Sequence, residues 1–403
     1  METPDMPPDS TFDPAAPLPG LPEPWTGAPT PSLRPGPPFH MTDMIAAEPG
    51  LAGRLLRRLD GADGSAAELA GAVRTAMEAG EPVVVTGCGT SEHGALAVVE
   101  ILRDAATSAG LPGALISAEQ AFELSLAPPA WGLVVGVSHE GGTAATNAAM
   151  EAARAAGRRT AAITVSGHSP LATLADVVVA TEELDQGWCH TIGYISPILA
   201  AAAVGARLSD RALDPDVVAD LIDAGRRDQA GAERIAGILA DAADLLVIAS
   251  GADRPAGREL VLKVEEASWL PSAYRDLETF LHGHLPATGA ATGLVLVLTD
   301  PDRRDERVAR ARQALAAAGV IGLRTAAIVS ASVDRSLDPD LTPAGRLVIP
   351  DSPGLPGPVA ALLSSVTPLQ LLTERLARAR GTNPDLIRRD DPVYRAAADA
   401  AGN

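Results

Sequence analysis

The chain has 403 residues, which is enough to bury a large core, and this length predicts two domains. Hydrophobic residues make up 46% of it and aromatic residues only 3%, which indicates a core of Ala, Val, Leu and Ile. The formal net charge is −19, so DNA and RNA backbones are not expected partners.

The sequence shows no sign of export or membrane insertion. It has no run of about 18 apolar residues, so we expect no transmembrane helix and no membrane partner. The N-terminus lacks the basic stretch and apolar core of a secretory signal. The two cysteines, Cys88 and Cys189, give no disulfide framework and fit a reducing cytoplasm, which is the predicted location.

Residues 1–40 form a Pro-rich arm without hydrophobic periodicity, which we interpret as disordered or draped over the surface. Helical patterns follow at 41–59 and 64–78. In the first of them Thr42 is the predicted N-cap, and the Pro49-Gly50 pair predicts an interruption.

From residue 82 onward, strand and helix patterns alternate, which predicts βαβ units and parallel sheets. The predicted strands are 83–85, 114–116, 133–137, 161–165, 177–180, 245–250, 293–298, 325–329 and 347–349. The main predicted helices are 93–108, 119–126, 143–156, 169–174, 257–270 and 357–380, with a helix-rich stretch at 192–242. The predicted fold class is therefore α/β, with doubly wound parallel-sheet domains at 41–210 and 211–380 and a C-terminal tail, 381–403, over the active site.

Two strands end in loops of small and hydroxyl residues that lead directly into a helix. The first loop is Gly87-Cys88-Gly89-Thr90-Ser91, and the second is Ser138-His139-Glu140-Gly141-Gly142-Thr143. Free N–H groups and the positive end of a helix dipole converge at such a turn, which suits an anion such as a phosphate. Ligands of open parallel sheets bind past the carboxyl ends of the strands, so the two loops together predict one phosphate site. Ordinary helix capping by Thr143 is the alternative.

The helix predicted at 257–270 carries a second candidate group. Of the 32 basic residues only Lys263 is a lysine, and an ammonium group can lose its proton where a guanidinium cannot. Lys263 and Glu266 are three residues apart and share a helix face, so they can act together. A solvated surface ion pair is the alternative, and the pattern alone does not choose between Glu265 and Glu266.

Both loops, the opening helix Met41-Thr42-Asp43-Met44-Ile45 and the stretches 266–268 and 278–285 resemble motifs of the sugar isomerase (SIS) family over residues 41–390. The resemblance implies two SIS-type domains. It also implies a phosphosugar aldose–ketose isomerase, or a deaminase or deglycase of aminosugar phosphates, that works through an enediol or enolamine. Glu266 would be the carbon base, Lys263 its electrostatic partner and His282 the ring-opening group, which in the family often comes from the other subunit of a homodimer.

The same resemblance implies a set of substrate-binding residues and no metal or organic cofactor. The implied residues are Gly89, Thr90, Ser91, Ser138, His139, Thr143, Thr191 and, from the tail, Arg388, for which Arg389 is the alternative. The sequence departs from the family pattern at Glu140, Asp185, His190 and His284, which suggests a substrate unlike fructose 6-phosphate. Glu140 also places a carboxylate beside the expected phosphate, which is unfavourable unless it points away.

Two other interpretations stay open. His282 and His284 could form half of a metal site with His190 or Cys189, although the paired ligand spacing of a zinc motif is absent. A non-catalytic sugar-phosphate-binding regulator would keep the loop hydroxyls but have no use for Glu266 or His282. Because the chain begins with a Pro-rich arm rather than a nucleophile-led glutaminase domain, glutamine-dependent amination is not expected.

Overall fold

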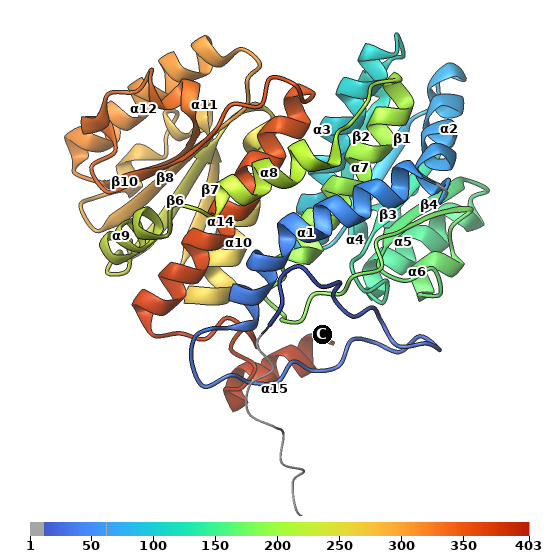
Figure 1. Ribbon diagram of the computed structural model, residues 1–403, viewed down its shortest axis with the longest axis horizontal. Coiled ribbons are helices and arrows are strands. Elements are labelled where there is room, and N and C mark those ends of the chain that lie inside the picture. The colour runs from blue at the N-terminus through green and yellow to red at the C-terminus, as the bar shows by residue number, and fades with distance from the viewer. Residues whose placement is uncertain (1–11, 62, 403) are drawn as a thin grey trace, which may run out of the picture.

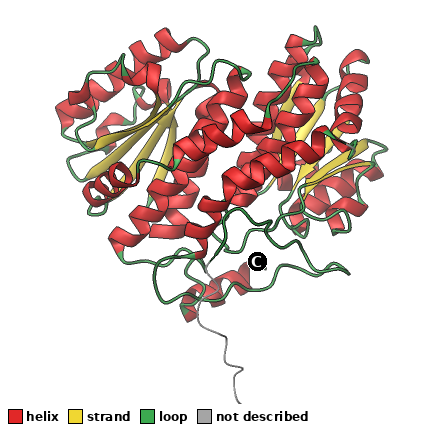
Figure 2. Ribbon diagram, in the orientation of Figure 1, coloured by secondary structure: helices red, strands yellow, loops and turns green. Residues whose placement is uncertain are grey.

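The structure is a computed structural model that describes residues 12–61 and 63–402 (Figure 1). Two five-stranded parallel sheets lie side by side, with helices around and between them (Figure 2). The predicted α/β fold with two doubly wound parallel sheets is confirmed.

The first sheet has the strand order β2-β1-β3-β4-β5. Its strands are β1 (Val83–Gly87), β2 (Ile116–Gln120), β3 (Leu133–Val137), β4 (Arg159–Thr164) and β5 (Val177–Ala180). Successive side chains point to opposite faces, so Val83 and Val85 enter the large central core while Val84 packs under α4 and α5 on the other face. The second strand begins later than predicted, because residues 113–115 form a 3₁₀ turn before it.

The second sheet has the order β10-β9-β8-β6-β7. Its strands are β6 (Asp244–Ala249), β7 (Ser272–Asp276), β8 (Thr292–Leu298), β9 (Arg324–Ser330) and β10 (Gly345–Ile349). Numbered within their own sheet, the strands of both sheets follow the order 2-1-3-4-5, so both have a topological switch point between the first and third strands. The sequence analysis missed β7, a half-buried polar edge strand without an apolar run.

Helices surround both sheets and are numbered in chain order. They are α1 (His40–Asp60), α2 (Ser65–Glu78), α3 (Thr90–Ser108), α4 (Ala121–Leu126), α5 (Ala144–Ala155), α6 (Pro170–Thr173), α7 (Ile192–Ser209), α8 (Pro215–Gly225), α9 (Gln229–Leu239), α10 (Arg254–Ser268), α11 (Leu277–Phe280), α12 (Arg304–Ile321), α13 (Ala331–Asp334), α14 (Gly357–Arg380) and α15 (Pro392–Ala401). The predicted helices at 41–59, 93–108, 257–270 and 357–380 correspond to α1, α3, α10 and α14.

Two expectations for the first helix are wrong. The N-cap of α1 is Phe39, and Thr42 occupies the third helical position, where its Oγ1 accepts a hydrogen bond from the Phe39 N–H at 3.1 Å. The helix also runs through Pro49 without a break. One backbone hydrogen bond is lost there, but burial of the apolar face, including Leu51 and Leu55, stabilises the helix on both sides of the proline.

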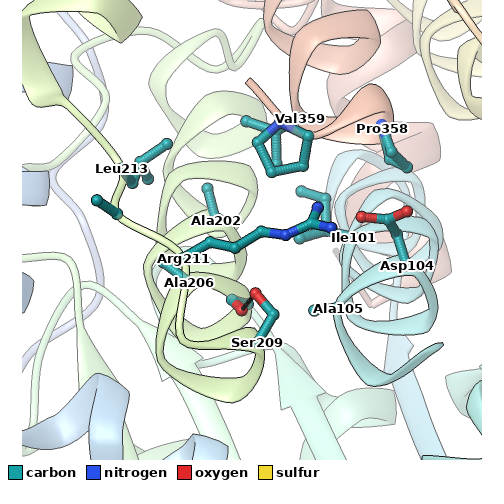
Figure 3. Close-up of a pocket in the computed structure, with 13 residues that line it drawn as sticks. Ile101, Asp104, Ala105, Ala202, Ala206, Ser209, Arg211, Leu213, Pro358 and Val359 are labelled. Atoms are coloured by element: carbon teal, nitrogen blue, oxygen red, sulfur yellow. Dashed lines mark hydrogen bonds between the residues drawn. The ribbon is translucent and has the colours of Figure 1, made fainter. Parts of the chain in front are cut away.

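Helix α7 is the one described helix long and apolar enough to cross a membrane, which the sequence analysis did not anticipate. The helix has 18 residues and 83% of it is buried inside the protein, as is typical of a core helix. It packs against α3, and the N-terminus of α14 closes the space between them. The cavity left there holds about 10 Å³, and its lining includes Ile101, Ala202, Val359, Asp104 and Arg211 (Figure 3). It has room for about one water molecule, so α3, α7 and the start of α14 pack closely at this point.

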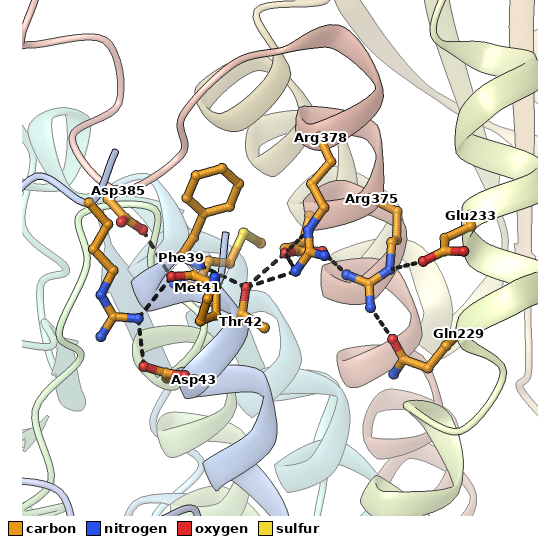
Figure 4. Close-up of polar contacts among 12 residues, drawn as sticks. Phe39, Met41, Thr42, Asp43, Gln229, Glu233, Arg375, Arg378 and Asp385 are labelled. Carbon is orange, nitrogen blue, oxygen red and sulfur yellow. Dashed lines mark hydrogen bonds and ion pairs between the residues drawn. The ribbon is translucent and has the colours of Figure 1, made fainter. Parts of the chain in front are cut away.

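A buried carboxylate ties α1 to α14. Glu374 accepts hydrogen bonds from Thr42 Oγ1 at 2.7 Å and Arg378 Nε at 2.6 Å, and it pairs with Arg375, which extends to Gln229 on α9 (Figure 4). Because Glu374 is fully buried, its charge requires these partners. The network fixes the start of the chain's first helix against the second half of the molecule.

The described part of the Pro-rich arm, residues 12–39, contains no helix or strand and lies against the first half of the molecule. Its backbone bonds to the segment after β5: the Leu18 N–H donates to Glu183, and Pro19 O accepts from Leu184, both at 2.9 Å. Leu21 packs with Val165 and Leu184 in a small apolar cluster. Residues 1–11 of the predicted arm lie outside the described residues.

Candidate active site

A cavity of about 740 Å³ opens at the carboxyl ends of β1 and β3, the switch point of the first sheet. We call it the switch-point cavity. Its wall combines the two predicted loops with the segment before α7, the C-terminal part of α10 and the tail. The structure brings these predicted site residues together in its wall: Thr90, Ser91, Ser138, His139, Thr143 and Glu266.

The first loop is shaped by glycine. Gly89 has a φ of +56°, and a Cβ on Gly87 would lie 2.5 Å from Ser91 O, so neither position accepts a side chain without strain. The chain turns sharply there into α3, a helix of 19 residues whose N-terminal dipole end faces the cavity. Thr90 Oγ1 donates to Glu259 at 3.2 Å, and Ser91 lines the cavity beside it.

The second loop places its hydroxyl groups close together. Ser138 Oγ lies 3.1 Å from Thr143 Oγ1 and accepts a hydrogen bond from the Gly141 N–H at 3.2 Å. Gly141 has a φ of +76°, and a Cβ there would lie 2.3 Å from Ser169 Oγ. Helix α5 starts immediately after Thr143, so this loop also ends at a helix N-terminus.

The Pro-rich arm holds Glu140, the carboxylate that departs from the family pattern. Its Oε2 accepts a hydrogen bond from the Ala28 N–H at 3.2 Å, and its backbone carbonyl accepts one from Trp25 Nε1 at 3.2 Å. The Trp25 ring packs on Gly142, where a Cβ would lie 3.3 Å from it. Glu140 still lines the cavity, but its hydrogen bond to the arm lowers its electrostatic conflict with an anion at Ser138 and Thr143.

Helix α10 supplies the charged cluster. Lys263 Nζ lies 2.6 Å from Glu266 Oε2 and 3.6 Å from Glu259 Oε1. The Lys263 side chain is only 1% exposed, so it lies behind Glu266 and not in the cavity wall. The surface ion-pair alternative is wrong for this pair, whereas Glu265 is exposed and accepts from the Ser272 N–H at 3.1 Å.

These contacts shift the pKa values of the cluster in opposite directions. Burial raises the pKa of Glu266 despite the opposing Lys263 charge. The pKa of Glu259 is lowered despite burial, because Lys263, His93 and Thr90 all favour its ionised form. The pKa of Lys263 is raised, since the attraction of Glu266 and Glu259 exceeds the cost of burial. Glu266 is therefore the carboxylate of the cluster best suited to gain and lose a proton.

The sequence analysis missed Glu259 and His93. Glu259 is fully buried, and its Oε2 lies 2.7 Å from His93 Nδ1 on α3. Glu259 could have been predicted from the sequence, because residues 259, 263 and 266 fall on one face of α10. The histidine could not be found in this way, since it comes from a helix far away in the sequence.

Other predicted site residues lie outside the cavity wall. His282 is on an exposed turn, where Nε2 lies 2.6 Å from Glu278, and it contributes nothing to this cavity within the same chain. Thr191 is buried just before α7, and its Oγ1 has no hydrogen-bond partner among the residues that the structure describes. Arg388 stacks between Trp269 and Tyr394 at 4.3 and 3.8 Å from the ring centroids and lines a neighbouring cavity.

The tail residue in the cavity wall is Arg389, which the sequence analysis held as the alternative to Arg388. Its guanidinium lies 5.1 Å from the centre of the Trp188 ring. In the part of the chain that the structure describes, no group of three or more His, Cys, Asp or Glu side chains could hold a metal ion.

Comparison with curated proteins finds relatives of one kind. The chain is 25% identical over 314 residues to glutamine–fructose-6-phosphate aminotransferase (isomerizing) of Methanothermobacter thermautotrophicus, covering 76% of this chain and 50% of that protein. It is 26% identical over 323 residues to the protein of the same name from Pyrobaculum aerophilum, covering 78% and 51%. The chain thus spans about half the length of the curated relatives it matches. No family model matches the chain.

Solved structures show the same fold. The C-terminal domain of glucosamine-fructose-6-phosphate aminotransferase from Francisella tularensis has a TM-score of 0.74 at 20% identity, over 88% of this chain and 100% of that one. Tagatose-6-phosphate ketose/aldose isomerase from Escherichia coli gives 0.70 at 18%, over 90% and 98%. Glucosamine-6-phosphate deaminase from Thermotoga maritima gives 0.61 at 16%, over 86% and 96%.

The two sheets with their shared strand order have the fold of these structures, and the chain resembles double-SIS proteins, which are built from two sugar isomerase domains. Within that class the chain resembles the isomerase half of glucosamine-6-phosphate synthase, as its sequence motifs predict.

Proposed function

We propose that the protein is a phosphosugar-processing enzyme, an aldose–ketose isomerase or a deaminase or deglycase of aminosugar phosphates. One observation carries the proposal: Glu266 lines the same cavity as the hydroxyls of Ser91, Ser138 and Thr143. A phosphate held by the two loops leaves a hexose lying across the cavity toward α10. A cytoplasmic location is part of this proposal.

In this reaction Glu266 takes a proton from one carbon of the open-chain sugar and returns it to the neighbouring carbon through an enediol or enolamine. Lys263 lies 2.6 Å from the Glu266 carboxylate, which it stabilises and orients. Glu259 forms a second ion pair with the Lys263 ammonium group at 3.6 Å. The α3 and α5 N-termini stabilise the phosphate charge. Arg389 from the tail is a further cation for the substrate.

His282 belongs to the proposal only as a residue that a second subunit contributes to the cavity of the first, in a homodimer. Mixing Glu266→Gln and His282→Ala chains tests this arrangement, because hybrid dimers that share sites regain part of the activity. Absence of recovery after confirmed subunit exchange would show that each chain builds its site alone.

The direct test is a thermal-shift screen of hexose, pentose and aminosugar phosphates against their unphosphorylated forms, followed by turnover assays of the compounds that bind. Wild type should be stabilised only by phosphorylated sugars. The Glu266→Gln variant should bind them equally well but lose about 10³-fold in kcat, since general base catalysis typically contributes 10²–10⁴-fold. Glu265→Gln is the matched control on the same helix, and its kcat should stay at the wild-type value. Equal stabilisation by unphosphorylated sugars would refute the phosphate site.

A non-catalytic sugar-phosphate-binding protein is the second candidate, and the position of His282 outside the cavity of its own chain favours it. In that case neither wild type nor Glu266→Gln turns over any sugar phosphate, although both bind the same ones.

A further inference from the structure

The switch-point cavity contains an imidazole to which the reaction above gives no role. His190 lines the wall together with Glu266. Neither ring nitrogen bonds another protein group in the described part of the chain, and only burial and the charges of Lys263 and Glu259 act on it. The neighbouring ring of His139 lies 5.3 Å away, but its Nε2 accepts a hydrogen bond from the Asp185 N–H at 2.9 Å. His139 is thus engaged by the protein, while His190 is free to meet a ligand.

The first turn of α7 is built to hold both rings. A Cβ on Gly193 would lie 3.1 Å from His190 Cβ, 3.2 Å from its Nδ1 and 3.3 Å from His139 Cγ, each closer than nine in ten real Cβ contacts. The Gly193 N–H also donates to Asp185 at 3.2 Å, so the backbone here is fixed. The absence of a side chain at this position gives the His190 ring its place in the wall.

The surroundings of His190 favour the neutral form of its ring. Burial and the nearby Lys263 cation lower its pKa to about 3, against the opposing charge of Glu259. A neutral imidazole has one N–H donor and one acceptor nitrogen. Its N–H can therefore donate a hydrogen bond to a developing oxyanion without any prior change in the protonation state of the ring.

Isomerisation needs such a donor. When a proton leaves carbon, negative charge develops on the carbonyl oxygen, and a group positioned at that oxygen lowers the barrier. Lys263 does not fill this position, because its side chain is 1% exposed and its ammonium is held by Glu266 and Glu259. His190 lies in the wall that Lys263 does not reach.

We propose that His190 is a catalytic residue whose ring N–H binds the carbonyl oxygen of the open-chain sugar and carries protons between O1 and O2. This inference rests on the function proposed above. For an aldose, Glu266 takes the C2 proton, the electron pair forms the C1–C2 double bond, and O1 takes the imidazole proton. The same nitrogen then accepts the O2–H proton, O2 becomes the carbonyl oxygen, and Glu266 returns its proton to C1. Both side chains end in their starting protonation states.

The kinetic test compares His190→Ala, His190→Gln and wild type, with fructose 6-phosphate and glucosamine 6-phosphate as the first probes and any further sugar phosphate identified by the screen. His190→Ala should lower kcat about 10²-fold or more, as loss of an oxyanion donor does, with the substrate Kd changed less than about threefold. His190→Gln keeps a neutral N–H donor and should recover part of the loss. His168→Ala, which removes an exposed imidazole from the loop after β4, is the matched control and should retain full activity.

The outcomes separate the two proposals. If wild type turns over no sugar phosphate, the proposed function fails. If wild type is active and His190→Ala keeps its kcat while Kd rises, His190 only binds the sugar and this inference is overturned. Thermal unfolding of each variant establishes that the fold is intact.

A spectroscopic readout covers the case in which His190→Ala does not fold. With ¹⁵N-histidine in the wild-type protein, the His190 ring should stay neutral from pH 5 to 9, as a pKa of about 3 requires. Its N–H resonance should move downfield on addition of arabinonohydroxamate 5-phosphate, a mimic of the enediolate. A ring that titrates near its ordinary pKa of about 6.5, or that ignores the bound mimic, would overturn the proposal.

Discussion

The two sheets have the same strand order, but the carboxyl edges at their switch points differ in chemistry. In the first sheet, the loops after β1 and β3 carry Ser91, Ser138 and Thr143, and a cavity of about 740 Å³ opens between them. In the second sheet, the corresponding segments after β6 and β8 carry Asp253 and Asp300, whose carboxylates accept hydrogen bonds from backbone N–H groups of these segments.

The carboxylates of Asp253 and Asp300, at the carboxyl edge of the second sheet, are held by hydrogen bonds and an ion pair. The Ala252 N–H donates to Asp300 Oδ2 at 2.8 Å, and the N–H groups of Thr299 and Asp300 donate to Asp253 Oδ2 at 2.6 and 2.9 Å. Arg307 pairs with Asp300 at 2.8 Å. Burial, and after it the nearby Asp300 charge, raise the pKa of Asp253 to about 7.

The comparison shows how one backbone arrangement serves two purposes. Strand ends and helix N-termini offer N–H donors in both sheets. Where the loop supplies its own carboxylate, that carboxylate accepts the hydrogen bonds of the N–H groups and stabilises the fold at the strand ends. Where it supplies hydroxyl groups and glycine, the N–H donors stay available for the anion that we propose above, and α10 contributes Glu266 to the wall of the same cavity.

The largest expected effect lies at the second edge. Asp300→Ala leaves the Ala252 N–H without its acceptor and removes the buried ion-pair partner of Arg307, which keeps its contacts with Asp302, so it should lower the free energy of unfolding by about 3 kcal/mol. Urea denaturation measures this loss, and the affinity for sugar phosphates should not change. Asp302→Ala is the control, since that side chain is 74% exposed and meets the same arginine at 3.7 Å. A loss of sugar-phosphate affinity in Asp300→Ala with normal stability would reverse the roles of the two edges.

The pH dependence of turnover tests the role of Glu266 in the switch-point cavity of the first sheet. Glu266 must be ionised to act as a base, and burial raises its pKa above the usual 4.5. As pH falls through this raised value the carboxylate is protonated, so kcat should decrease about tenfold per pH unit on the acid side. The acid limb of a kcat profile should therefore lie above pH 4.5, and it should be absent from the residual activity of Glu266→Gln. A limb at or below pH 4.5 would mean that another group controls turnover.

A smaller effect is expected at the second loop. Ser138→Ala removes one hydroxyl from the proposed phosphate site and leaves the Gly141 N–H without its acceptor. We expect the Kd for sugar phosphates to rise about five- to tenfold, in line with about 1 kcal/mol for one hydrogen bond. Isothermal titration measures it, and Ser332→Ala, on the carboxyl side of β9 in the second sheet, is the matched control with unchanged affinity. Equal affinities in all three proteins would move the anion away from this loop.

The smallest expected effect concerns the Pro-rich arm. Trp25→Ala removes the bond from Nε1 to Glu140 O and the ring that packs on Gly142. The Glu140 carboxylate is then less firmly held by the arm, and the Kd should rise about two- to threefold, as expected for a weak change in repulsion. Adding Glu140→Gln should cancel this rise. A persisting loss in the double variant would indicate that the arm acts by another route.

Much of the fold could be predicted because its strands are continuous apolar runs, as in Val83–Val85 and Leu133–Val137, with Gly or hydroxyl residues at their ends. Strand β7 was missed because Ser272–Asp276 is polar and is recognisable as a strand only from its pairing with β6. The Thr42 cap and the Pro49 break failed because tertiary burial overrides local preference in α1.

The site was predictable where a local pattern existed. Lys263 and Glu266 share a helix face in the sequence, but the burial of Lys263 behind Glu266 depends on packing of α10 against α3. The contact of His93 with Glu259, and that of Ala28 with Glu140, join segments more than 100 residues apart, so no local signal could reveal them.

The most direct measurement is a crystal structure of the protein with fructose 6-phosphate or another sugar phosphate that binds in the thermal-shift screen. The account predicts the phosphate between the Ser91 and Ser138 loops, with C1 and C2 of the sugar about 3.5 Å from the Glu266 carboxylate. A phosphate bound instead in the cavity of about 610 Å³ along β8–β10, beside Arg304 and Arg335, would contradict it. So would a sugar whose reacting carbons lie beyond the reach of Glu266.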